Sequence, residues 1–142
     1  MMKIIIKRIE RAFALTLDLV EALSESDLML KLENLPSNTI SDQLWCVVGA
    51  RESYLKAIEA GSWEGFSCSL KDKHSKEEIM SCLKRTSESL NKFLEGDELS
   101  EAQVKLLFDL LEHEVQHHGQ LIRYVYANKL VFPQSWNNRY TV

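Results

Sequence analysis

Four stretches of the chain repeat apolar residues at steps of three and four, the spacing that places side chains on one face of an α-helix. The first stretch runs from about Lys3 to Leu23, with apolar positions at Ile6, Ile9, Phe13, Leu17 and Val20. The others run from Thr39 to about Ala60, from Ser75 to near Gly96, and from Ser100 to about Asn128. No stretch alternates as a strand does. The pattern predicts an all-α fold with four long helices.

Polar residues mark the expected ends of these helices. The spacing of a capping box, in which two residues cap each other's backbone amides, occurs at Thr39 and Asp42, Ser75 and Glu78, and Ser100 and Gln103. Gly96 predicts a left-handed residue that ends the third helix. The tail, residues 129–142, carries Pro133, Trp136 and Tyr140, and is too aromatic for a disordered end. We expect it to pack on the helices.

Four helices of similar length around one core form a four-helix bundle, and 142 residues suffice for a single domain, residues 1–142. The fourth helix carries more apolar surface than one core needs. Its main stripe consists of Val104, Leu107, Phe108, Leu111, Val115, Ile122 and Val125, and Leu106, Leu110, Leu121 and Tyr124 lie beside it. Burial against two neighbouring helices explains a band this wide, and so does a bundle contact plus a subunit interface. We expect a homodimer.

Charge and cysteine content narrow the range of partners. A net charge of −4 argues against binding to nucleic-acid phosphates, which requires a concentrated basic face. No apolar run approaches the ~20 residues of a membrane span, and the start has too short an apolar segment for a signal peptide. The three cysteines, Cys46, Cys68 and Cys82, are an odd number without a Cys-x-x-Cys pair. Free thiols favour a reducing compartment, so we expect a cytoplasmic protein.

The most informative motif lies in the fourth predicted helix, where three of the four histidines fall between His113 and His118. Residues four apart lie on the same side of a helix, so His113 and His117 can present two imidazoles to one point. Two neutral nitrogen ligands suit zinc, nickel or iron. An ordinary surface or packing role is the alternative, and a third ligand would decide between them.

A second pair at the same spacing, Glu114 and His118, can form a ligand pair, a base with its orienting partner, or a buried hydrogen bond. Residues His113 to His117 also fit the His-Glu-x-x-His pattern of metalloproteases, in which Glu114 would be the general base. A protease needs a substrate cleft and usually a strand edge that holds the peptide. A small all-helical chain offers neither, so the pattern does not favour proteolysis here.

Two glycines inside predicted helices need a reason, because glycine costs roughly 1 kcal/mol relative to alanine there. Close approach of another backbone or of a ligand would explain both Gly49 and Gly119. Around Gly49, small residues recur at steps of four, three and four, at Cys46, Ala50, Ser53 and Ala57. Such a stripe lets two helices pack closely. It also lets the Cys46 thiol face the interior, as a small apolar group or, deprotonated, as a metal ligand.

The fourth stretch resembles the DinB-like superfamily of small bacterial four-helix-bundle proteins. The family pattern there is His, three residues, His, a variable residue, then Gly-Gln, which matches His113, His117, His118 as the variable residue, Gly119 and Gln120. The second stretch is similar through residues 40–45 and 49–55, and the tail through Val-Phe-Pro-Gln-Ser-Trp. The resemblance extends over nearly the whole chain.

This resemblance implies a divalent metal held by three histidines, two of which are His113 and His117. The third falls on Cys46, so it implies either a Cys-His-His site, with zinc or nickel, or a degenerate site that has lost its ion. Some relatives are metal-dependent transferases or isomerases that use low-molecular-weight thiols. We therefore expect a small-molecule S-transferase or isomerase; the alternative is a non-catalytic helical dimer that serves in ligand binding or stress response.

Overall fold

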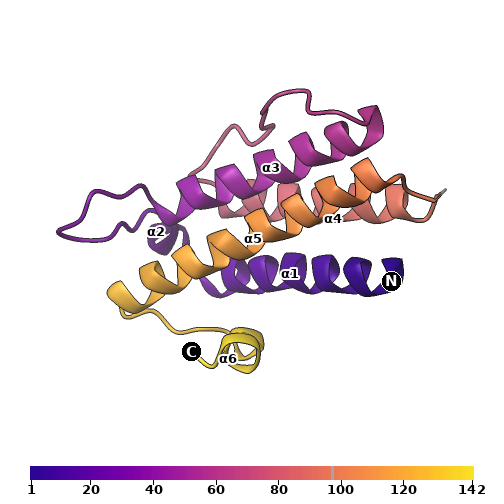
Figure 1. Cartoon of the computed structure of the whole chain (residues 1–142). Helices are drawn as coiled ribbons and strands as arrows, with labels where there is room; N and C mark the ends of the chain where they lie inside the picture. The colour runs from indigo at the N-terminus through magenta and orange to yellow at the C-terminus, as the bar shows by residue number, and fades with distance from the viewer. Residues whose placement is uncertain (97) are drawn as a thin grey trace.

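The computed structural model describes residues 1–96 and 98–142, and the regular secondary structure of these residues is α-helical. The four long helices are α1 (Met2–Ala22), α3 (Ile40–Ala60), α4 (Lys76–Leu94) and α5 (Glu101–Ala127) (Figure 1). Two short helices, α2 (Glu25–Leu28) and α6 (Gln134–Tyr140), lie in the first connection and in the tail. The predicted all-α class is confirmed.

The long helices pack side by side around a common interior (Figure 1). Helices α1 and α3 each contact both α4 and α5, so every long helix has two long neighbours. The short helices α2 and α6 pack against α3 and α1, respectively. None of the helices that the structure describes is long and apolar enough to cross a membrane.

The apolar core consists of two clusters that follow one another along the helices. One cluster, nearer the start of α1, contains Ile5, Ile9, Phe13, Ile58, Leu90, Leu107 and Leu110. The other contains Leu15, Leu19, Leu44, Val48, Leu83, Leu121 and Trp136 among its members. Between them lies a layer of buried polar side chains, one or more from each long helix: Thr16, Arg51, Thr86, Glu114 and His118. The interior is therefore not uniformly apolar but is crossed by one polar layer.

The helix caps agree with the sequence in two of three cases. The reciprocal capping boxes at the starts of α3 and α5 are both present. At α4, Ser75 caps the backbone amide of Glu78, but the Glu78 carboxylate accepts from the amides of Lys71 and Asp72 instead of returning to Ser75. The prediction for Gly96 is wrong: it has no positive φ, and α4 ends at Leu94 with the Gly96 amide bonded to the Phe93 carbonyl.

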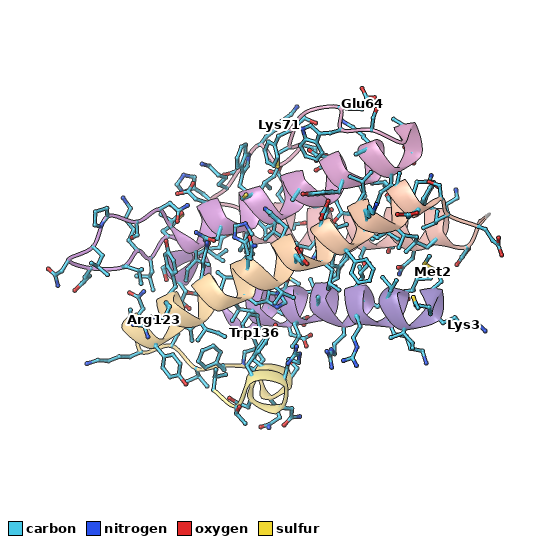
Figure 2. The ribbon with its side chains drawn as sticks, in the orientation of Figure 1. Met2, Lys3, Glu64, Lys71, Arg123 and Trp136 are labelled. Carbon is cyan, nitrogen blue, oxygen red and sulfur yellow. The ribbon has the colours of Figure 1, made fainter. Side chains whose placement is uncertain are left out.

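The tail packs against the long helices, as its aromatic content predicts. Trp136 is fully buried and points from α6 toward the long helices (Figure 2). Its indole Nε1 donates to the carbonyl oxygen of Leu15 on α1 at 2.7 Å. Burial of an aromatic side chain of this size, with its polar group satisfied, anchors α6 to α1.

The buried face of α5 differs from the predicted stripe. Phe108 and Val115 are 42% and 38% exposed, although the pattern placed both in the core-facing band. The buried side of the helix consists of Leu107, Leu110, Glu114, His117, His118, Leu121, Tyr124 and Val125. The helix is rotated relative to the prediction because its interior positions include three polar residues, which an apolar pattern counts as surface.

Gly49 is explained by the long connection between α3 and α4 rather than by a neighbouring helix. A Cβ atom at Gly49 would overlap the ring of Phe66 and lie 2.9 Å from Cβ of Cys68. The glycine thus lets this connection lie directly on α3. Gly119 is exposed, and a Cβ atom added there would have no neighbour within 4 Å, so the expected close approach is absent among the described residues.

Candidate metal centre

Cys46 on α3 and the pair His113 and His117 on α5 meet at the contact between these two helices. One potential ligand atom from each residue lies within 4.8 Å of the other two. The three residues that the sequence singled out are therefore brought together as a possible metal site. The pairing of α3 with α5 makes this possible, because these two helices form the most extensive helix–helix contact of the described residues.

His117 is held in an orientation that suits a metal ligand. Its Nδ1 lies 2.5 Å from Oε1 of Gln43, and the amide nitrogen of Gln43 donates to Oδ1 of Asn38 at 2.9 Å. Because the Gln43 oxygen can only accept, Nδ1 of His117 carries the proton and Nε2 keeps its lone pair. Metal-bound histidines almost always donate their other N–H to such an acceptor. Gln43 is a neighbour of the candidate centre that the sequence analysis missed.

The distance between Cys46 and His113 fits a shared ion. Sγ of Cys46 lies 3.6 Å from Nε2 of His113. Zinc bonds of about 2.3 Å to sulfur and 2.05 Å to nitrogen, at a tetrahedral angle, place the two ligand atoms about 3.6 Å apart. Nδ1 of His113 is buried and has no hydrogen-bond partner in the described protein. An ion bound through Nε2 would leave this second ring nitrogen without a partner, in contrast to Nδ1 of His117.

The protonation states of the two histidines suit metal binding at neutral pH, whereas that of Cys46 has to change. Burial, followed by the neighbouring His113, lowers the pKa of His117 to about 4. Burial also lowers the pKa of His113. Both rings are therefore neutral and able to donate a lone pair to an ion. Burial raises the pKa of the Cys46 thiol, so this residue must lose a proton when it binds a cation.

Aromatic residues surround the centre. The ring of Tyr54, on α3, lies 6.5 Å from that of His113 and 5.1 Å from that of Trp63 in the connection after α3. Trp45 packs against Phe66 of the same connection, with ring centroids 5.3 Å apart. Trp63 and Phe66 are both about half exposed. Tyr54 is thus the aromatic residue in contact with a candidate ligand, and Trp63 of the connection packs against Tyr54.

Glu114 lies between the two histidines in sequence but enters the core instead of the metal centre. Arg51 donates to both of its oxygens, from Nε to Oε2 at 3.1 Å and from Nη2 to Oε1 at 2.5 Å. Nη1 of Arg51 donates to the carbonyl of Leu83, and its side chain is 1% exposed. Burial raises the pKa of Glu114, but the charge and hydrogen bonds of Arg51, with smaller effects of His118 and Thr16, outweigh it and hold that pKa below its usual value.

The second predicted pair, Glu114 and His118, belongs to a buried hydrogen-bond chain. The Thr16 hydroxyl bridges them, at 2.5 Å from Oε1 of Glu114 and 2.8 Å from Nε2 of His118. A carboxylate only accepts, so Thr16 donates to Glu114 and accepts from the Nε2–H of His118. Nδ1 of His118 then accepts from the Tyr140 hydroxyl, 2.6 Å away. This chain of hydrogen bonds leads from the tail to the Arg51–Glu114 ion pair, and each residue along it donates to the next one toward Glu114.

This arrangement shows the role of the pair Glu114 and His118. Both oxygens of Glu114 are occupied in a fully buried ion pair, so Glu114 is not available as the general base of a metalloprotease. His118 is neutral, since burial is the main cause that lowers its pKa to about 4. Of the three roles considered for Glu114 and His118, the structure shows the buried hydrogen bond. Arg51 and Thr16 belong to the same network, and the sequence analysis did not identify them.

Comparison with known proteins adds no family to these observations. No family model matches the chain, and no curated protein shows significant similarity to it. The DinB-like resemblance, drawn from the second and fourth stretches and the tail, stays a prediction.

Proposed function

We propose that the protein binds one divalent transition-metal ion, zinc or nickel, through Cys46, His113 and His117, and that the bound ion serves small-molecule thiol chemistry. The observation that carries the proposal is the hydrogen bond from His117 to Gln43, which leaves Nε2 of His117 as a fixed acceptor beside the other two ligands. A set of two imidazoles and one thiolate is that of a catalytic zinc site with one position open to a substrate.

Each residue of the centre has a distinct part in this proposal. Gln43 and Asn38 orient the ring of His117, and Cys46 supplies the negative charge that favours a cation over a neutral ligand. When bound, the metal supplies Lewis acidity that lowers the pKa of a substrate thiol and makes it a nucleophile at neutral pH. Tyr54 and Trp63 provide apolar walls at which the carbon skeleton of a small substrate packs. These assignments agree with a DinB-like transferase or isomerase.

The metal is tested on protein prepared without a polyhistidine tag. One equivalent of zinc or nickel should remain after purification without chelators, and His117→Ala should lose it. Cobalt(II) should give a sulfur-to-metal charge-transfer band that disappears in Cys46→Ser. Cys68→Ser is the matched control, because the Cys68 thiol donates to the carbonyl of Trp45 and lies outside the cluster. A metal-free protein whose melting temperature ignores added zinc and nickel overturns the proposal.

The thiol chemistry needs a separate measurement. Addition of a low-molecular-weight thiol to the cobalt form should shift the charge-transfer spectrum, because a second sulfur enters the open position. An unchanged spectrum, together with tight metal binding, leaves a metal protein and removes the transferase hypothesis. The predicted homodimer is tested in the same preparation by sedimentation equilibrium, in which a single species near 16 kDa contradicts it.

A further inference from the structure

A positively charged cavity lies between α1, α5 and α6, apart from the metal centre. Its volume is about 190 Å³, and three arginines line it: Arg8 and Arg11 on α1 and Arg139 on α6. The remaining lining residues are Ala12, Leu15, Leu111, Val115 and Tyr140. An apolar floor and a cationic rim therefore meet in one small space, and no acidic residue is among the lining residues described.

The three arginines are exposed and have no ion-pair partner among the described residues. None of these arginines takes part in a salt bridge there, although the chain has 21 acidic residues against 17 basic ones. Partial burial, followed by the positive charges of Arg139 and Arg8, lowers the pKa of Arg11. Mutual repulsion among guanidinium groups is relieved by a bound anion, for which arginine offers paired donors.

A second cavity adjoins the first and shares Arg11 and Arg139 with it. This cavity has a volume of about 420 Å³ and is also lined by Asp18, Ser135 and Asn138. The Ser135 hydroxyl is buried and lacks a hydrogen-bond partner in the described residues. Ser135 and Arg139 are four residues apart on α6 and so lie on one side of it. Asp18 forms no salt bridge with either arginine in the described structure.

Arg139, near the end of α6, already contacts an aromatic ring in the absence of a ligand. The guanidinium carbon of Arg139 lies 4.7 Å from the centroid of the Tyr140 ring. The Tyr140 hydroxyl is in turn bonded to His118 in the polar layer of the core. A donor that is already positioned loses less entropy on binding than a free surface side chain.

We propose that α1 and α6 form a binding site for a small organic carboxylate. The carboxylate group lies between Arg11 and Arg139 and accepts from the Ser135 hydroxyl as well. The apolar part of the ligand enters the smaller cavity and packs on its apolar floor, which consists of Ala12, Leu15, Leu111 and Val115.

The size and lining of the cavity select this ligand class. A volume of about 190 Å³ is below the roughly 300–1,000 Å³ of pockets for drug-sized ligands, so the ligand is small. Inorganic phosphate would satisfy the arginines but leave the apolar floor uncovered. The site also accounts for the exposure of Val115, which pattern reasoning placed in the core. Leu111 and Val115 lie on the side of α5 opposite His113, so the site is separate from the metal centre.

Benzoate, a carboxylate with a compact apolar body, is the probe, and isothermal titration calorimetry is the measurement. We expect saturable binding that weakens about tenfold in Arg11→Gln and in Arg139→Gln, since each variant loses a charge-assisted hydrogen bond. Ser135→Ala should weaken it a few-fold. Arg123→Gln is the matched control: Arg123, labelled in Figure 2, is an exposed arginine of α5 that lines neither cavity, and its loss should leave the affinity unchanged.

Three results would each overturn the proposal. The first is the absence of benzoate binding at millimolar concentrations. The second is an affinity that stays the same in Arg11→Gln and Arg139→Gln, with circular dichroism melts confirming that both variants fold. The third is binding of inorganic phosphate as tight as that of benzoate, because the apolar floor then has no part in recognition.

Discussion

Replacement of Glu114 by glutamine tests whether the polar layer of the core depends on its ion pair. Glutamine has nearly the shape of glutamate, so the substitution removes the charge and little else. Arg51 would stay 1% exposed, with its positive charge no longer balanced by a carboxylate. Loss of one partner of a buried ion pair costs about 3–5 kcal/mol, because the other charge stays buried without compensation.

The expected loss is large enough to measure by both common methods. Urea unfolding followed by circular dichroism should show a free energy of unfolding lower by about 3–5 kcal/mol for Glu114→Gln. A domain of this size loses roughly 3 °C in Tm per kcal/mol, so Tm should fall by roughly 10–15 °C. Calorimetry at the same pH provides an independent value. A change of less than about 1 kcal/mol would refute the reasoning.

A double variant separates the ion pair from the packing around it. Arg51→Met combined with Glu114→Leu removes both charges and retains most of the buried volume. We expect it to be more stable than Glu114→Gln, because no unpaired charge remains in the core. The Thr16 hydroxyl keeps an acceptor in that variant, the carbonyl of Ala12 at 3.3 Å. Equal instability of the two variants would show that packing, and not charge, dominates.

Other substitutions test single contacts. Tyr140→Phe leaves Nδ1 of His118 buried without a donor, so the free energy of unfolding in urea should fall by about 1–3 kcal/mol. An unchanged value would show that the tail is loosely attached. Burial lowers the pKa of His118 to about 4 in the folded protein, so the unfolded chain binds more protons than the folded one between pH 4 and about 6.5. The free energy of unfolding should therefore fall as the pH is lowered from about 6.5 to 4. A profile that is flat over this range contradicts the prediction. Gly119→Ala should raise the free energy of unfolding by about 1 kcal/mol, because nothing in the described structure lies near the added carbon. A loss of stability would instead reveal a binding partner at this position. Gly49→Ala should destabilise by about 1–3 kcal/mol, since its Cβ would overlap the Phe66 ring, and thermal melts check both glycine variants.

Local signals in the sequence predict the helices and the three residues that the structure brings together as a possible metal site. The periodic apolar positions and the capping residues place α3 within a residue of its observed bounds, Ile40–Ala60. The spacing of His113 and His117 on α5, with Cys46 at the small-residue face of α3, is likewise a property of single helices. These features depend on neighbours in sequence, so a pattern reveals them.

The partners across the core depend on contacts that no local pattern contains. Arg51 and Glu114 are 63 residues apart, and Gln43 reaches His117 across 74. The sequence does contain one indication of the ion pair. Arg51 lies on the same face of its helix as the apolar residues Val47 and Ile58, and a charged residue on a buried face needs a partner of opposite charge. The rotation of α5 and the contact between Gly49 and Phe66 both arise from packing of the whole chain. For that reason the pattern predicted the wrong face of α5 and did not reveal the Phe66 contact.

The dependence of the core on α6 has a consequence for how the protein is made. Residues 134–140 leave the ribosome after all four long helices have been synthesised, and domains begin to fold as they emerge. Until α6 docks, the site of Trp136 is an open apolar groove beside Leu15, and His118 lacks the hydroxyl of Tyr140. Chains that stop before this segment expose surface that chaperones and proteases recognise. The folded core is therefore completed only after translation has passed α6.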